Sequence, residues 1–355
     1  MEPERTSNFD FKMIFGKTRE EVDAILNDKE RHIHRFTIPK KDGSERVVIA
    51  PDDDLKHIQK FVYFRFLKRY SYHEAAHGFV PKRGIVTNAT QHLRCISLGK
   101  VDIKSFFDSI SVDHLKNCLF GNKNICRYCS KYTRMLDGKC HPSLYKNKVV
   151  NFEYKCEEIK AIFIPNYCDE TGYQSLFKRV IEACTYNGFT AQGFPTSPML
   201  ANIVMRGFDI AMTEHCKQHG ITYTRYADDL AFSSPTLSPL ELMEKTKKKA
   251  YALLWAFKFS PKREKTRYRG KGSRLKICGV VINKNPNVQK SLFKKFRAKV
   301  HHAIYKFPDH TTKSRIRCLK GWASFLMSVN PEKGNKYMRQ LTEFENKKFP
   351  RTAAA

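Results

Sequence analysis

The chain has 355 residues, 41% of them apolar, which excludes a disordered chain and leaves room for one large core or for two or three subdomains. Its 65 Lys and Arg against 35 Asp and Glu give a formal charge of +30, which favours a polyanionic partner, nucleic acid first and an anionic membrane second. No secretory signal opens the sequence, and no run of about 18 apolar residues predicts a spanning helix. Eleven cysteines without an export signal favour reduced thiols or metal ligands in a cytoplasmic protein that is not held at a membrane.

The first predicted elements lead to a basic hairpin. Residues 8–30 have an amphipathic helical pattern, and residues 36–49 predict two strands joined by an Asp-Gly turn, with Lys40 on one arm and Arg46 on the other. Such a hairpin could clamp a triphosphate, since Arg offers a bidentate fork and Lys a point charge. Basic hairpins are, however, more often solvated sheet edges.

Asn88 and His92 follow the next predicted helix, residues 53–70, and a loop at residues 77–84. They lie at the start of a further helical stretch. From their residue types alone, they are a helix cap and a histidine satisfied by hydrogen bonds in the core.

Asp102 is a carboxylate in an otherwise apolar segment. Residues 98–110 predict a short strand that runs into a turn, where Asp108 suits a cap. Burying Asp102 inside this strand would be costly unless it holds a cation or a proton. The sequence therefore makes Asp102 a candidate metal ligand.

Cysteines are concentrated in an insertion at about residues 120–172. Cys126 and Cys129 have the Cys-x-x-Cys spacing, and together with Cys140 or His141 and with Cys156 they supply ligand types that suit tetrahedral zinc. A second Cys-x-x-Cys is missing, so reduced cysteines packed in a small insertion are the alternative.

Two adjacent aspartates lie in the most informative stretch, residues 224–232. Strand-forming residues on either side predict a β-hairpin with Asp228 and Asp229 at or near its turn. Neighbouring carboxylates suit Mg²⁺, and two such ions about 3.5–4 Å apart can stabilise the attacking and leaving oxygens of a nucleotidyl transfer. The alternative is a solvated Asp-Asp turn.

The segments around this hairpin are helical or basic. A loop at residues 191–198 leaves Gln192 and Ser197 at its surface and opens a helix over residues 199–213. Residues 239–257 predict another helix, residues 275–282 a buried strand, and residues 290–350 a helical region with 15 Lys or Arg against four acidic residues. Within that region the helical spacing of Leu319, Trp322, Phe325 and Leu326 predicts core positions.

The order of these motifs resembles that of reverse transcriptases. Residues 226–229, Tyr-Ala-Asp-Asp, resemble the catalytic tetrapeptide, residues 192–198 the second palm motif and residues 102–108 the first catalytic motif. The resemblance covers about residues 36–330 and implies an α+β right-hand polymerase with fingers, a palm of the split βαββαβ kind and a helical thumb. The implied parts are an N-terminal helical extension at 1–35, fingers with part of the palm at 36–101, the palm with its Cys-rich insertion at 102–286 and a basic thumb at 287–352.

The resemblance also implies roles for individual residues. Asp102, Asp228 and Asp229 would hold two Mg²⁺ ions together with the backbone carbonyl of Ile103, and Phe107 falls at the steric-gate position, where a ring crowds a ribose 2′-OH. Lys265 lies near the place of a lysine that approaches the leaving pyrophosphate, although a solvated basic loop is an equal alternative. Further nucleotide contacts are expected from Lys40, Arg46 and Gln192, and RNA contacts from Asn88, His92, Arg297 and Lys299.

Asn-Ala-x-x-His at residues 88–92 resembles a signature of the retron branch of bacterial reverse transcriptases. This implies a polymerase that copies a cognate structured non-coding RNA into a branched RNA–DNA hybrid for phage defence, with deoxynucleotides as substrates and an effector protein as a further partner. Ile-Cys-Gly at residues 277–279 departs from the Val-Thr-Gly common in retron relatives. The alternatives are another defence-associated or intron-like reverse transcriptase and a catalytically silent RNA-binding scaffold, against which the intact aspartates argue.

Overall fold

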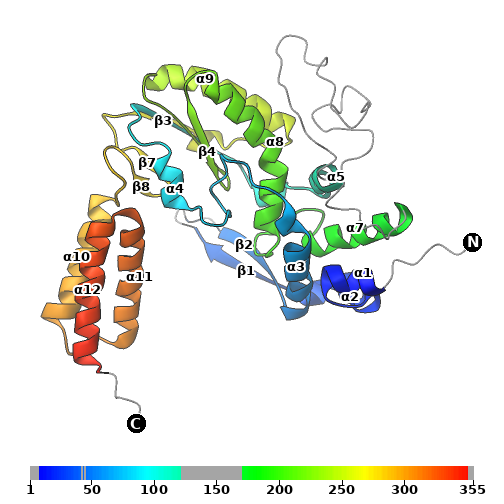
Figure 1. The fold of residues 1–355 in the computed structure, drawn as a ribbon, viewed down its shortest axis with the longest axis horizontal. Coiled ribbons are helices and arrows are strands. Elements are labelled where there is room, and N and C mark those ends of the chain that lie inside the picture. Colours follow the sequence, from blue (N-terminus) through cyan, green and yellow to red (C-terminus); the bar gives the residue numbers. More distant parts are fainter. Residues whose placement is uncertain (1–7, 41–42, 44, 121–169, 351–355) are drawn as a thin grey trace, which may run out of the picture.

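The computed structural model describes residues 8–40, 43, 45–120 and 170–350 (Figure 1). Its N-terminal part is helical, as predicted, with α1 at Asn8–Phe15 and α2 at Arg19–Asn27. α2 begins at a capping box, in which the side chains of Thr18 and Glu21 each accept a hydrogen bond from the other residue's backbone amide. Both helices pack their apolar faces on α3, Asp53–Arg65, and join one core with it.

The predicted basic hairpin forms from β1, Ile33–Pro39, and β2, Glu45–Pro51. It is anchored where the Ile49 amide donates to the carbonyl oxygen of Gln192 at 2.8 Å. Gly193, the next residue, has φ 124°, and a Cβ at this position would lie 2.5 Å from the Ile49 carbonyl oxygen. Only glycine allows the loop at residues 191–198 to approach the hairpin this closely.

A four-stranded antiparallel sheet forms the centre of the structure, with the strand order β4-β5-β3-β6. Helices lie between β3 and β4 and between β5 and β6 along the chain, so the first strand is central and the last is at an edge. This is the topology of the predicted split βαββαβ palm. The strands are β3 at Ser97–Asp102, β4 at Thr222–Tyr226, β5 at Asp229–Ser234 and β6 at Arg267–Gly270.

The two faces of this sheet have different surroundings. α8, Ser197–Lys217, and α9, Pro239–Ala256, cover one face, where Val101, Leu230 and Phe232 are fully buried with them in one core (Figure 1). Side chains of alternate residues point to the opposite face. That face therefore carries Lys100, Asp102 and Asp229. The further helices of this part are α4 at Ile85–Thr90, α5 at Val112–Phe120 and α7 at Glu170–Cys184.

The prediction of a single buried strand over residues 275–282 is wrong. Two short strands, β7 at Lys276–Ile277 and β8 at Val280–Val281, pair with each other instead. Cys278 and Gly279 between them have φ 45° and 90°, the positive values that a two-residue hairpin turn of the I′ type needs.

Three helices at residues 290–348 form a C-terminal helical bundle at one end of the molecule (Figure 1). Its core is continuous with residues of the β7–β8 hairpin and with Leu98 and Ala231 of the central sheet. The bundle therefore packs onto the sheet through a shared apolar cluster. Its helices are α10 at Lys290–His301, α11 at Lys313–Val329 and α12 at Pro331–Lys348.

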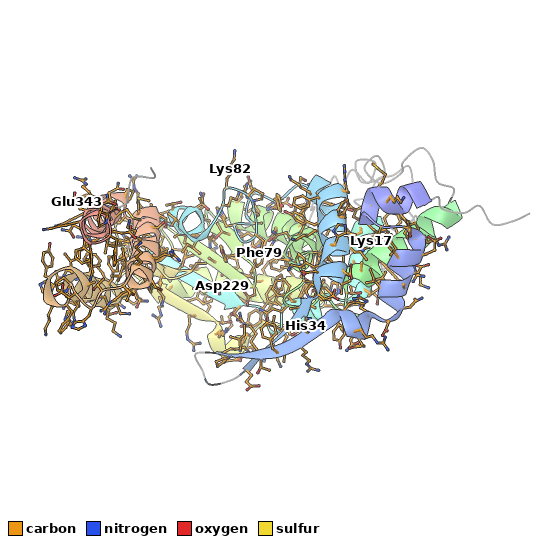
Figure 2. The ribbon with its side chains drawn as sticks, turned by 90° about the horizontal axis from the view of Figure 1, so that it is seen from below. Lys17, His34, Phe79, Lys82, Asp229 and Glu343 are labelled. Carbon is orange, nitrogen blue, oxygen red and sulfur yellow. The ribbon has the colours of Figure 1, made fainter. Side chains whose placement is uncertain are left out.

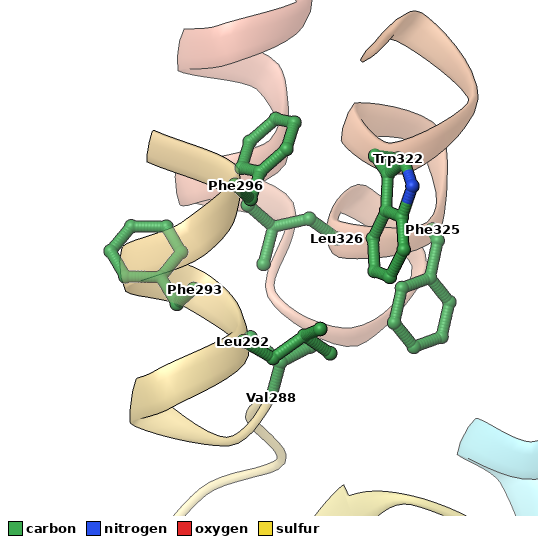
Figure 3. Close-up of a pocket in the computed structure, with 7 residues that line it drawn as sticks. All are labelled: Val288, Leu292, Phe293, Phe296, Trp322, Phe325 and Leu326. Atoms are coloured by element: carbon green, nitrogen blue, oxygen red, sulfur yellow. The ribbon is translucent and has the colours of Figure 1, made fainter. Parts of the chain in front are cut away.

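Trp322 is 38% exposed, which corrects the prediction that it lies in the core of the bundle. Leu319 and Leu326 of the same helix are each only 3% exposed. Trp322 instead stands beside Phe325 on the wall of a shallow apolar groove between α10 and α11 (Figure 3). Within the described ranges, no helix is both long enough and apolar enough to cross a bilayer.

Candidate active site

The three predicted carboxylates meet at one end of the central sheet, where Figure 2 labels Asp229. Asp102 ends β3 and is paired in register with Asp229, the first residue of β5. Asp228 lies in the turn that joins β4 to β5, directly after Ala227, whose φ of 55° is left-handed. The amide of Ile103 donates to the Asp228 carbonyl oxygen at 3.0 Å, which ties the end of β3 to this turn. The chain thus brings together residues that lie more than a hundred positions apart.

Two lysines pair with these carboxylates. Lys265 Nζ lies 3.0 Å from Asp102 Oδ2, and Lys100 Nζ lies 3.4 Å from Asp229 Oδ2. Burial, the neighbouring Asp102 and the neighbouring Asp229 raise the pKa of Asp228 to about 6. Burial also raises the pKa of Asp102, although the contact with Lys265 opposes this. The site therefore concentrates negative charge that only cations can balance.

The three carboxylates fit hard divalent cations, which prefer oxygen ligands, and the backbone carbonyl of Ile103 as a further ligand stays a prediction. The three aspartates do not gather their oxygens as tightly as His32, Asp52 and Asp54, the one ligand cluster within 4.8 Å found in the part of the chain that the structure describes. That other cluster has a structural explanation, because Asp52 caps α3 and binds His32, and Asp54 pairs with Lys17. Asp102 and Asp229 are instead each paired with a lysine ammonium group, from Lys265 and Lys100.

A basic cleft of about 540 Å³ leads away from Asp102 and Asp229 along the open face of the sheet. The strand registers explain its lining, because Lys100 pairs with Arg267, and Leu98 with Arg269. Sequence reasoning did not identify Lys100, Arg267 and Arg269 as lining residues. Lys100 lies two residues before Asp102 and Arg269 two after Arg267, the spacing that places side chains on one face of a strand. The cleft is lined by Leu98, Lys100, Asp102, Asp229, Lys265, Arg267, Arg269, Arg274, Lys276 and Gln289.

Phe107 lies five residues beyond Asp102, in a 3₁₀ turn over Phe107–Ser109. Its half-buried ring has its centroid 5.4 Å from that of Phe106 and 6.1 Å from that of Phe79, an exposed ring with φ 61°. The Thr190 hydroxyl donates to the Phe107 carbonyl oxygen at 2.7 Å. Aromatic packing restrains the ring, and this hydrogen bond holds the backbone of the turn that carries it.

The other predicted nucleotide contacts, Lys40, Arg46 and Gln192, lie in or beside the β1–β2 hairpin. Burial raises the pKa of the Asp108 carboxyl. The positive charge of the nearby Lys40, which is exposed, opposes this rise. Arg46 is exposed and lies opposite Ile38 in the hairpin register. Gln192 is half-buried and connects to β2 through its carbonyl oxygen. Their contacts with a nucleotide stay a prediction.

The prediction that Asn88 and His92 contact RNA directly is wrong for this arrangement, because both are buried. His92 has no exposed surface, and its two ring nitrogens each lie 2.7 Å from a hydroxyl, Ser233 Oγ and Thr224 Oγ1. Burial lowers the pKa of His92 to about 3, so the ring is neutral. The Asn88 side chain donates to the Cys278 sulfur at 3.4 Å. Both residues instead fasten the segment around α4 to the sheet and to the β7–β8 hairpin.

Arg297 and Lys299 are exposed on α10, while Phe296 and Val300 of the same helix are buried. This leaves both charges available to a polyanion. The predicted zinc ligands Cys126, Cys129, Cys140 and Cys156 lie outside the described residues, so zinc binding stays a prediction.

The sequence matches the family described as "Reverse transcriptase (RNA-dependent DNA polymerase)" over residues 38–282, well over half of the chain. The chain belongs to the reverse transcriptase family. The matched region begins in β1 and includes all three aspartates and the basic residues of the cleft.

Similar proteins carry the name of retron reverse transcriptases. Retron Mx162 reverse transcriptase of Myxococcus xanthus is 30% identical over 335 residues, which cover 90% of this chain and 62% of that protein. Retron Mx65 reverse transcriptase of the same species is 26% identical, covering 88% and 65%. Retron Ec86 reverse transcriptase of Escherichia coli is 24% identical, covering 88% and 81%. The chain therefore spans slightly less than two thirds of the length of the two Myxococcus relatives.

Proposed function

We propose that this chain is an RNA-directed DNA polymerase of the retron type, a cytoplasmic enzyme that copies a cognate structured non-coding RNA into a branched RNA–DNA hybrid. The observation that carries the proposal is the convergence of Asp102, Asp228 and Asp229 at the head of a basic cleft. The names of the similar proteins support the retron type. Fingers at 36–101, a palm at 102–286 and a thumb at 287–352 are part of the proposal.

In this proposal, Asp102, Asp228 and Asp229 hold two Mg²⁺ ions, which when bound stabilise charge on the attacking 3′ oxygen and on the leaving pyrophosphate. Lys265 shields Asp102 before substrate enters. Because 51% of its side chain is exposed, Lys265 is also free to turn toward a triphosphate. The ring of Phe107 excludes a ribose 2′-OH, and Lys40, Arg46 and Gln192 contact the incoming deoxynucleotide.

The basic residues divide into two groups. Those of the cleft neutralise the phosphates of a primer–template duplex next to the aspartates. Those of the C-terminal helical bundle, with Arg297 and Lys299 as examples, contact the cognate RNA, whose recognition must rest on shape or on unpaired bases because charge alone does not read sequence. The retron type further implies a role in phage defence and an effector protein as a partner.

Primer extension on an RNA template with deoxynucleotides and Mg²⁺ tests the polymerase activity. We expect Asp228→Asn to abolish extension while RNA binding is retained, and Asp113→Asn, a change at an exposed aspartate on α5, to leave both unaltered. Undiminished synthesis by Asp228→Asn would refute the site assignment. A wild-type protein that binds RNA and never extends a primer would indicate the RNA-binding scaffold instead.

A second measurement separates the retron type from other reverse transcriptases. It compares the affinity for the structured RNA encoded beside the gene with that for an unrelated hairpin RNA of equal length at physiological salt. The retron type predicts a clear preference for the neighbouring RNA. Equal affinities would leave a general or intron-like polymerase.

A further inference from the structure

A buried ion pair lies directly behind the turn that carries Asp228. Arg225 of β4 and Asp209 of α8, two elements that lie side by side (Figure 1), have no exposed side-chain surface. The Arg225 Nε donates to Asp209 Oδ1 at 2.8 Å and Nη2 donates to Oδ2 at 2.6 Å, so the pair is bidentate. Tyr223 adds a hydrogen bond from its hydroxyl to Asp209 Oδ1 at 2.8 Å. An apolar pair of similar volume could hold α8 against the sheet at least as well, so the ion pair calls for another explanation.

The third guanidinium nitrogen of Arg225 reaches the catalytic turn. Its Nη1 donates to the carbonyl oxygen of Ala227 at 3.2 Å. Ala227 has the left-handed φ of 55°, which a residue with a Cβ adopts only when its surroundings hold it there. Because Asp228 follows at once in the chain, the orientation of the Ala227 peptide sets the direction in which Asp228 leaves the turn.

Gly78 restrains the same turn from its other side. A Cβ on Gly78 would lie 2.6 Å from the Ala227 amide nitrogen, so the backbones of the two residues are in direct contact. Asn202 of α8 connects the two restraints, because its Nδ2 donates to the Gly78 carbonyl oxygen at 3.0 Å and its Oδ1 accepts from Arg225 Nη2 at 3.1 Å. The backbone of Ala227 is thus held at its carbonyl oxygen by Arg225 and at its amide nitrogen by Gly78.

We propose that Arg225, held by Asp209 and Asn202, and Gly78 are positioning residues that fix the Ala227–Asp228 turn and thereby set the affinity of the aspartate site for divalent cations. The proposal rests on the proposed role of Asp228 as a metal ligand. It assigns no contact with substrate to Arg225 or Gly78, whose effect passes entirely through the backbone of the turn. A purely structural role would change stability and leave cation affinity as it is.

Mn²⁺ titration of the purified full-length protein without nucleic acid, followed by the electron paramagnetic resonance signal of free Mn²⁺, measures that affinity directly. Asp228→Asn, which removes a proposed ligand, gives the Mn²⁺ affinity expected when the site is lost. Arg225→Lys keeps the positive charge beside Asp209 and removes the fork that also reaches Ala227. Gly78→Ala leaves the Arg225–Asp209 ion pair intact and adds a Cβ that would lie 2.6 Å from the Ala227 amide nitrogen, so the turn must shift. Both should weaken Mn²⁺ binding about tenfold or more, as is usual when a residue that orients a metal ligand is changed.

Tyr223→Phe is the matched control. It removes a buried hydrogen bond from Asp209 and keeps the Arg225 contact with Ala227, so it should lower the melting temperature while Mn²⁺ affinity stays within about twofold of wild type. Folded Arg225→Lys and Gly78→Ala proteins that bind Mn²⁺ as wild type does would overturn the proposal. If Arg225→Lys does not fold, Gly78→Ala decides alone. Primer extension by the wild-type protein is scored separately, so an inactive wild type counts against the proposed function and unchanged Mn²⁺ affinity in the variants counts against the positioning role.

Discussion

Asp228 is ionised at neutral pH in surroundings that oppose its charge, since burial and two neighbouring carboxylates raise its pKa from 3.8 to about 6. A group whose pKa is higher in the folded state stabilises the protein as the neutral acid. That contribution is fully present below the unfolded pKa and is lost as the pH rises through about 6. The metal-free protein is therefore less stable above pH 6, where this buried carboxylate is ionised, than it would be with a neutral side chain at this position.

We expect Asp228→Asn to stabilise the metal-free protein at pH 8, because it removes this charge and keeps the shape of the side chain. The gain follows from the pKa shift and reaches up to about 3 kcal/mol at pH 8, falling toward zero near pH 4. Denaturant unfolding at both pH values in the presence of chelator measures it, with Asp113→Asn as the exposed control. A less stable Asp228→Asn protein at pH 8 would contradict this account.

Phe107 is predicted to exclude ribonucleotides. Its ring is held by packing with Phe106 and Phe79, so it cannot easily move aside for a 2′-OH. Phe107→Ala should raise the ratio of ribonucleotide to deoxynucleotide incorporation by on the order of 10–100-fold, the range over which an apolar wall rejects one extra hydroxyl.

Single-nucleotide extension assays measure this ratio. Phe64→Ala, which removes an exposed ring on α3, is the control and should leave the ratio unchanged. An unaltered ratio for Phe107→Ala would mean that another residue forms the gate.

At the scale of elements, the local sequence predicted helices and hairpins correctly wherever the turn-forming residues and the apolar periodicity agreed. The hairpin around Asp228, the helix after residue 196 and the basic hairpin at 33–51 all form. The strand predicted at 275–282 failed because its uninterrupted apolar pattern hid a two-residue turn at Cys278 and Gly279. A continuous apolar run does not reveal where the chain reverses.

The sequence alone identified a site residue only where its residue type is rare in the surrounding sequence or would be energetically costly to bury there. Asp102 in an apolar strand and the Asp228–Asp229 pair met this condition. His92 did not, because its partners Ser233 and Thr224 lie 141 and 132 residues away in sequence, and only the folded chain reveals that both ring nitrogens are used. The Arg225–Asp209 ion pair could not be predicted from the sequence either, because only the folded chain shows that these two residues are partners.

The C-terminal helical bundle allows a comparison of core and surface positions on one helix. Leu319→Ala on α11 should cost about 2–5 kcal/mol, as large-to-small changes in a packed core do. Trp322→Ala should cost only about 1 kcal/mol, because the indole is partly solvated and loses mainly its edge contact with Phe325. Free energies of unfolding from denaturant titration compare the two. Equal losses would show that Trp322 supports the bundle core after all.

At the scale of the whole molecule, the charge of +30 predicts that any binding to nucleic acid depends strongly on salt concentration. Each phosphate contact adds about 0.7–0.9 to the slope of log affinity against log salt. Replacing Arg297 and Lys299 together by glutamine should therefore weaken RNA binding and lower the slope by about 1.4–1.8.

Filter binding or fluorescence titration across a range of salt concentrations checks this expectation. Lys245 and Lys248, two exposed lysines on α9, provide the control pair, whose replacement by glutamine removes the same charge from another surface. An equal loss of affinity and slope in both double variants would assign binding to net charge and not to the bundle.

The central position of β3 in the sheet has a consequence during synthesis on the ribosome. Both strands that flank it, β5 and β6, come later in the chain, and Lys100 and Asp229 are 129 residues apart. At about 5–20 residues per second, translation leaves β3 without either neighbour for roughly 6–26 s. Two open edges on an apolar strand are open to pairing with another chain throughout that interval. We therefore expect the nascent protein to need chaperone protection during the interval before β5 and β6 are synthesised and pair with β3.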